Sequence, residues 1–153
     1  MTKKADFNAE EWSTVVEAPL LAGMRVVTAH RGGTIRETLA MGQVYAQARQ
    51  KHGESELLDE LVSSPPALDQ QRVRAAGDLG KVVTEGVGGA IAVLQQKATP
   101  EEVDAYRNFV MDVAEAAAKA HKEGGFIGIG GKQVSESEQA ALDEIQASLG
   151  GTA

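Results

Sequence analysis

The sequence contains no cysteine, few aromatic residues and no long apolar run. The absence of cysteine excludes a disulfide framework, a thiol nucleophile and a thiolate metal site, and it fits a cytoplasmic protein. Aromatic residues make up only 4% of the 153 residues, so the core has to be built mainly from Ala, Val, Leu and Ile, which favours closely packed helices. No apolar segment approaches the roughly 20 residues of a membrane-spanning helix. The two lysines near the start are not followed by the apolar stretch of a secretion signal.

An excess of basic residues is also missing. The chain has 15 Lys and Arg against 22 Asp and Glu, for a net charge of −7 and a pI of about 5.0. This balance argues against a nucleic acid or an anionic membrane as the main partner. Apolar residues account for 42% and charged residues for 24%, which is the usual composition of a globular protein. At this length we expect one folded domain over residues 1–153, with an N-terminal arm over residues 1–7.

Local signals predict helices along most of the chain. Asn8 and Glu11 form a capping box, and Phe7 and Trp12 are spaced as the apolar pair that flanks such a box. They predict a helix from about residue 9, which Pro19 either kinks or divides in two.

Further start signals predict the other helices. Thr34 opens a helix that ends near Gly53, a shorter one covers residues 54–62, and a prolyl-rich loop at residues 63–68 separates the two halves of the chain. A longer helical pattern covers residues 69–97. Its glycines indicate either that neighbouring helices approach closely or that the helix breaks or kinks near residues 86–89, and we favour the break or kink. Thr99 and Pro100 start a helix to about residue 123, and Ser135 starts the last one, which Gly150 and Gly151 end. The apolar spacing of the first of these two helices predicts a buried stripe of Val103, Tyr106, Val110, Val113, Ala117 and Ala120. The sequence therefore predicts an all-α, single-domain bundle of about six or seven helices.

The two halves show a faint repeat. Residues 29–33 read Ala-His-Arg-Gly-Gly before the hydroxyl cap at Thr34, and residues 120–125 read Ala-His-Lys-Glu-Gly-Gly before the cap at Ser135. The halves are either structurally related, or each segment simply ends a helix with basic residues and glycine, as many helices do.

A glycine-rich apolar connector over residues 124–134 is the most unusual segment. Its spacing excludes a Walker loop, because Phe126 stands where the first glycine belongs and Gln133 replaces the hydroxyl residue. It also fails the dinucleotide-binding pattern. Either the connector buries its apolar side chains against the bundle, or it forms a ligand or partner surface. In the second interpretation that surface consists of Gly125, Phe126, Ile127, Gly128, Ile129, Gly130, Gly131 and Lys132.

Histidines at predicted helix ends are the only metal candidates. If the two halves pack symmetrically, His30 and His121 can meet near Glu123, and two imidazoles and one carboxylate suffice for zinc or iron. The alternative is that each histidine interacts with the carbonyl end of its helix and needs no metal. No other cofactor is predicted.

Catalytic patterns are weaker still. No serine lies in a nucleophile-elbow context, and the paired glutamates at residues 10–11 and 101–102 fall in first helical turns, where the helix dipole favours acids. We therefore expect a protein that is not an enzyme.

The segment from the glycine turn through Val134, Ser135, Glu138 and Leu142 resembles the helix-turn-helix unit of TerB-like domains, which are associated with tellurite resistance. The resemblance implies a helical fold of similar length. TerB-like domains share an Ala-Asp-Gly turn, whereas this chain has Ala-His-Arg-Gly-Gly and Ile-Gly-Gly-Lys, so the acidic turn residue that implies metal binding is missing here. Residues 123–138 also resemble the C-terminal pattern of small bacterial proteins without an assigned activity.

These observations predict a non-catalytic helical module that binds protein or self-associates. The predicted contact faces are the alanine- and glycine-rich stretches at residues 77–92 and 114–120. The alternative is a small-ligand or metal-binding, TerB-like stress-response protein that uses residues 124–132 and the helix-end histidines.

Overall fold

Helices make up the regular structure in the part of the chain that this computed structural model describes, residues 3–28, 34–51, 53, 55–63, 79–124 and 136–150. At residues 28, 34–38, 79, 121–124 and 136–138 the backbone alone is described. The elements are the short 3-10 turn η1 (Lys4–Asp6) and the helices α1 (Ala9–Thr28), α2 (Thr34–Gln50), α3 (Glu56–Val62), α5 (Leu79–Lys97), α6 (Pro100–Gly124) and α7 (Glu136–Ser148). The prediction of an all-α bundle of about six or seven helices is confirmed.

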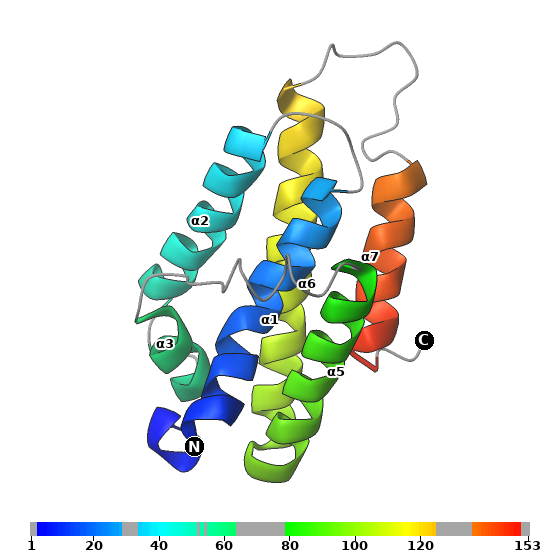
Figure 1. Cartoon of the computed structure of the whole chain (residues 1–153). Helices are drawn as coiled ribbons and strands as arrows, with labels where there is room; N and C mark the ends of the chain where they lie inside the picture. Colours follow the sequence, from blue (N-terminus) through cyan, green and yellow to red (C-terminus); the bar gives the residue numbers. More distant parts are fainter. Residues whose placement is uncertain are drawn as a thin grey trace.

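The helices α1 and α6 form the middle of the bundle (Figure 1). Helix α1 packs against α5 and α6, and α2 packs on another face of α6. Helix α7 contacts α5, α6 and α1, while α3 contacts α2, α6 and η1. The core is built mainly from Ala, Val, Leu and Ile, with few aromatic rings, as the composition predicts.

The start of α1 agrees with its sequence signals. The Asn8 side chain accepts a hydrogen bond from the Glu11 backbone N–H at 2.8 Å, and the Glu11 carboxylate accepts one from the Asn8 N–H at 3.0 Å. The rings of Phe7 and Trp12 lie 5.4 Å apart, centroid to centroid. The capping box and its apolar pair are therefore both confirmed.

Pro19 lies inside α1, and the helix continues through it, so of the two alternatives for this proline the division into two segments is excluded. A proline has no N–H, which leaves the carbonyl of Val15, four residues earlier, without its helical donor. The Tyr106 hydroxyl of α6 donates a hydrogen bond to that carbonyl at 2.7 Å, and both residues are fully buried. A side chain from the neighbouring helix thus replaces the hydrogen bond that the proline removes.

Helix α5 also continues through its glycines, so the predicted break near residues 86–89 is wrong. Gly86 faces α1, where a Cβ atom would come within 2.7 Å of the Leu21 side chain. At Gly89 the same construction leaves an ordinary distance of 3.7 Å to Thr14. Tight packing on α1 stabilises this helix in spite of the low helical propensity of its glycines.

Helix α6 begins as predicted, with the Thr99 hydroxyl accepting a hydrogen bond from the Glu102 N–H at 3.2 Å. All six residues of its predicted buried stripe are buried: Val103, Tyr106, Val110, Val113, Ala117 and Ala120. A second row on the same helix, which includes Phe109 and Ala114, is buried as well. The buried surface is wider than the predicted stripe because α1 and α2 cover different faces of α6.

The ends of the shorter helices are set by local groups. Helix α3 starts after Ser55, whose hydroxyl accepts a hydrogen bond from the Leu58 N–H at 3.4 Å, so it begins later than the predicted residue 54. Helix α7 is followed by Gly150, whose φ of +71° is in the left-handed region that favours glycine. The capping hydroxyls predicted at Thr34 and Ser135 lie outside the described side chains.

Candidate interaction surface

The site residues predicted from the sequence fall largely outside the described part of the chain. His30 and residues 125–132 of the connector are not described, and neither is the first copy of the faint repeat, residues 29–33. The backbone of His121 and Glu123 belongs to the last turns of α6, but their side chains are not described. The metal site, the ligand loop and the TerB-like alternative therefore stay predictions. Among the described residues, no three His, Asp or Glu side chains are grouped so that they could hold a metal ion.

The sequence analysis considered histidines at the carbonyl ends of helices. Among the described side chains, the basic residues that lie at helix ends are arginines and a lysine. The Arg49 Nε atom donates to the Val62 carbonyl at the end of α3, at 2.7 Å. The Arg107 Nε atom donates to the Leu149 carbonyl at the end of α7, at 2.8 Å. In both cases a cation from a neighbouring helix satisfies a terminal carbonyl and interacts favourably with the helix dipole.

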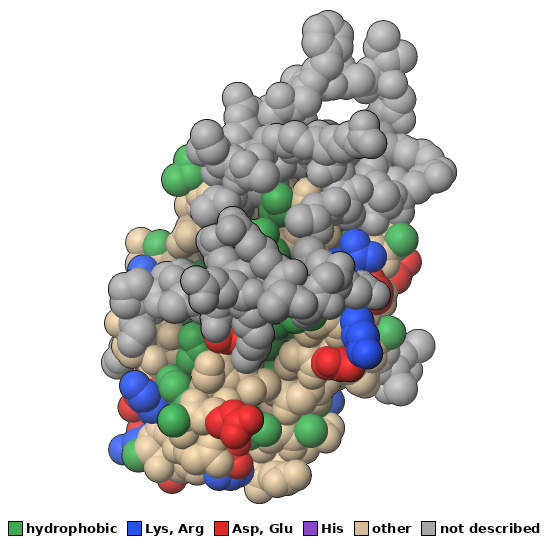
Figure 2. Space-filling view, viewed as in Figure 1, with side chains coloured by type: hydrophobic (Ala, Val, Ile, Leu, Met, Phe, Trp, Pro, Cys, Tyr) green, Lys and Arg blue, Asp and Glu red, His purple; other side chains and the backbone are tan. Residues whose placement is uncertain are grey.

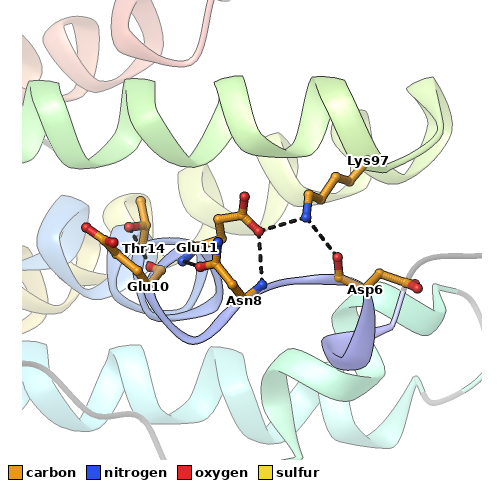
Figure 3. A network of polar contacts seen from close by, with 6 residues as sticks. All are labelled: Asp6, Asn8, Glu10, Glu11, Thr14 and Lys97. Carbon is orange, nitrogen blue, oxygen red and sulfur yellow. Dashed lines mark hydrogen bonds and ion pairs between the residues drawn. The ribbon is translucent and has the colours of Figure 1, made fainter.

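Lys97 links the end of α5 to the N-terminal arm (Figure 3). Its ammonium group donates to the Asp6 carbonyl at 2.9 Å and to the Glu11 carboxylate at 2.8 Å, and it lies 5.6 Å from the centre of the Phe7 ring. The hydrogen bond from Lys97, together with that from the Asn8 N–H, lowers the pKa of Glu11. Since Glu11 also caps α1, this network fixes the arm to the bundle and has a structural role.

The predicted contact faces on α5 and α6 are used within the chain, where they are described. Ala114, Ala117 and Ala120 of α6 are buried in the bundle, and Gly86 of α5 is packed on Leu21. These residues therefore supply close helix packing within one molecule, whereas Glu115, Ala116 and Lys119 of the α6 stretch line an open groove.

An open groove of about 640 Å³ lies between α2 and α6. The half-buried side chains Val44, Ala48 and Leu58 give it an apolar lining together with Phe109. The ring of Phe109 packs edge to face against the ring of Tyr45, with 5.0 Å between the ring centroids. The groove therefore has apolar side chains in its floor, which rest on a packed aromatic pair, and polar side chains around them.

The rim of the groove is polar and carries charges of both signs. Lys51 and Lys119 contribute positive charges, and Asp59, Asp112 and Glu115 contribute negative ones. Among the described residues, the two lysines, Asp112 and Glu115 form no ion pair. They remain available to a molecule that lies in the groove.

The exposed side of α2 continues this surface. Leu39 is 63% exposed and is the one large hydrophobic side chain that is exposed among the described residues. No charged residue occurs from Leu39 to Ala48, although Gly42, Gln43 and Ala46 of this stretch are exposed. On the upper left of Figure 2, hydrophobic side chains lie over the upper part of α2, and a basic side chain lies at its lower end. We call the exposed face of α2 from Leu39 to Ala48, together with the groove, the α2–α6 surface.

A second cavity, of about 860 Å³, lies below this surface, between α3 and the start of α6. Its lining is strongly acidic and contains a single lysine: Lys3, Glu56, Asp59, Glu60, Glu101 and Glu102. Lys3 is paired with Glu56 at 3.1 Å, and Asp59 accepts a hydrogen bond from the Gly53 N–H at 2.9 Å. The arrangement connects η1 and α3 and contains no nucleophile and base in contact.

Comparison with known proteins adds no assignment, since no family model, curated protein or solved structure matches the chain. Within the described residues, none of the helices has the length and apolar character to cross a membrane.

The sequence interpretation included part of the α6 side of this surface, in the stretch at residues 114–120, but missed its α2 side. Its one signal in the sequence is the charge-free stretch from residue 38 to residue 48 in a chain with 24% charged residues. A stretch without charges is equally typical of a buried helix and of an exposed contact face. Only the exposure of this stretch in the fold distinguishes the two.

Proposed function

We propose that this protein is a non-catalytic helical module that binds another protein chain through the α2–α6 surface. The observation that carries the proposal is the exposed Leu39 beside an apolar groove with a polar rim. Protein interfaces commonly combine an apolar centre with a polar, charged rim. An apolar surface on an otherwise charged protein is a frequent sign of an interaction site.

The character of the groove favours a protein ligand over a small molecule. It is an open groove between two helices, and its apolar lining comes from successive turns of α2, at Ala40, Val44 and Ala48, and from Phe109 and Ala116 of α6. An amphipathic helix of a partner can place apolar residues at successive turns into such a groove. Polar residues such as Gln43, Gln47 and Asn108 line its edges and can pair with the partner's backbone or side chains.

Site-specific photo-cross-linking tests the proposal. The photoreactive residue p-benzoylphenylalanine replaces Leu39 in one variant and Gln95 in a matched control, since Gln95 is an exposed, uncharged residue of α5. After irradiation of cells that express the protein at its native level, we expect covalent protein adducts from position 39 and none from position 95.

The adduct masses identify the partner. Absence of adducts at position 39, or equal adducts at both positions, would show that the α2–α6 surface is not an interaction site.

A further inference from the structure

A surface that binds a second copy of the same chain has to be complementary to itself. In a two-fold symmetric dimer the same patch contributes both sides of the interface, so its positive groups have to meet its own negative groups. Two copies of this chain each have a net charge of −7 and repel each other at long range. A dimer contact is therefore favourable only where a patch avoids placing carboxylates against carboxylates.

The α2–α6 surface meets this condition. Its centre is uncharged, and its rim carries two lysines and three carboxylates, Asp59, Asp112 and Glu115. Among the described residues, the two lysines, Asp112 and Glu115 form no ion pair. Two copies can thus pair Lys51 or Lys119 of one with Asp112 or Glu115 of the other. The neighbouring acidic cavity fails the same test, because it would oppose five carboxylates with five.

The sequence spacing on α2 suggests how two copies fit. Leu39 and Ala46 are two helical turns apart and lie on the same face, with Gly42 and Gln43 midway between them. If two α2 helices pack antiparallel about an axis at this midpoint, the leucine of each copy lies over the alanine of the other. At Gly42 a Cβ atom would meet nothing within 4 Å, so the helix surface there is open to a neighbouring helix.

We propose that the partner is a second copy of this chain, which forms a two-fold symmetric dimer through the α2–α6 surface. The proposal rests on the proposed function and specifies its partner. It also gives the mixed charges of the rim a role, since they select a self-complementary register between two acidic molecules.

Sedimentation velocity of the purified full chain over a range of micromolar concentrations tests the proposal. We expect a concentration-dependent dimer, and we expect Leu39→Glu to raise its dissociation constant at least tenfold, because it places two carboxylates in the uncharged centre. Gln95→Glu adds the same charge on an exposed position of α5 and should leave the dimer unchanged.

Cysteine cross-linking provides an independent readout, since the chain has no cysteine of its own. Gln43→Cys lies next to the proposed axis and should form a disulfide-linked dimer on mild oxidation, whereas Gln95→Cys should stay monomeric. Circular dichroism of each variant checks that it is folded.

Two results would overturn the dimer. A wild-type protein that is monomeric at every concentration refutes it, but leaves the proposed function standing if position 39 still gives adducts with a different chain. A dimer that is insensitive to Leu39→Glu and is not linked by Gln43→Cys refutes the use of this surface for self-association.

Discussion

The hydrogen bond between the Tyr106 hydroxyl and the Val15 carbonyl is expected to be among the most costly polar contacts to remove. It measures 2.7 Å and joins two fully buried residues. Because Pro19 offers no N–H, Tyr106→Phe leaves the carbonyl buried without this donor. Leaving a buried acceptor unsatisfied costs about 1–3 kcal/mol, more than the net contribution of an average hydrogen bond. We therefore expect the variant to lose about 2 kcal/mol in the free energy of unfolding.

The reason for this cost can be isolated with Pro19→Ala. An alanine at position 19 has an N–H that can donate to the Val15 carbonyl, so in this background Tyr106→Phe should cost only about 0.5–1 kcal/mol. Urea unfolding of the wild type, the two single variants and the double variant gives the coupling energy directly. We expect a coupling of about 1 kcal/mol or more.

Equal costs of Tyr106→Phe in the two backgrounds would refute this explanation. Such a result would mean that the hydroxyl stabilises the fold independently of the proline. The m-values of the four proteins have to agree, because a change in the m-value would indicate an altered unfolded state or an altered two-state transition.

Three further predictions concern other buried or paired groups. Gly86→Ala should be less stable than Gly89→Ala in thermal unfolding. At Gly86 the added methyl group overpacks the contact with Leu21, which costs about 1–3 kcal/mol, whereas at Gly89 alanine gains helix propensity of up to about 1 kcal/mol. Equal melting temperatures of the two variants would contradict the close packing at Gly86. Tyr45→Phe should keep or raise the free energy of unfolding, since no described residue is a hydrogen-bond partner for the buried Tyr45 hydroxyl. A decrease of more than about 1 kcal/mol in the free energy of unfolding would show that this hydroxyl has a hydrogen bond. Because the pKa of Glu11 is lowered, its carboxylate stabilises the fold at pH values above the usual pKa of 4.5, and this contribution is lost as the pH falls through the lowered pKa. Glu11→Gln should therefore be less stable than the wild type at neutral pH and equally stable in acid. A stability difference that does not change with pH would contradict the ion pair with Lys97.

Much of the helical framework follows from short-range signals in the sequence. The capping box at Asn8, the Thr99 cap of α6 and the glycine that follows α7 are local, and the structure confirms each of them. The spacing of apolar residues likewise predicts the buried stripe of α6. Such features depend on neighbours within about one or two helical turns, so they can be read from the chain directly.

The incorrect predictions share one cause. Pro19 and Gly86 were interpreted from their intrinsic tendency to interrupt helices, but contacts from Tyr106 and Leu21 on other helices decide their structural context. The α6 stretch at residues 114–120 is divided by the fold, since Ala114 and Ala117 are buried within one molecule whereas Glu115 and Lys119 line the groove.

The sequence alone determines the all-α class, the positions of most helix starts, the acidic net charge and the absence of thiol chemistry. Only the tertiary structure decides which uncharged helix face is exposed and which lies in the core. The physical reason is that helix propensity and capping act between residues close in the chain, whereas burial depends on which helices pack together. Leu39 and the groove beside it become a candidate interaction surface for that reason, since α1 and α6 bury the other faces of α2 and leave this one in contact with solvent.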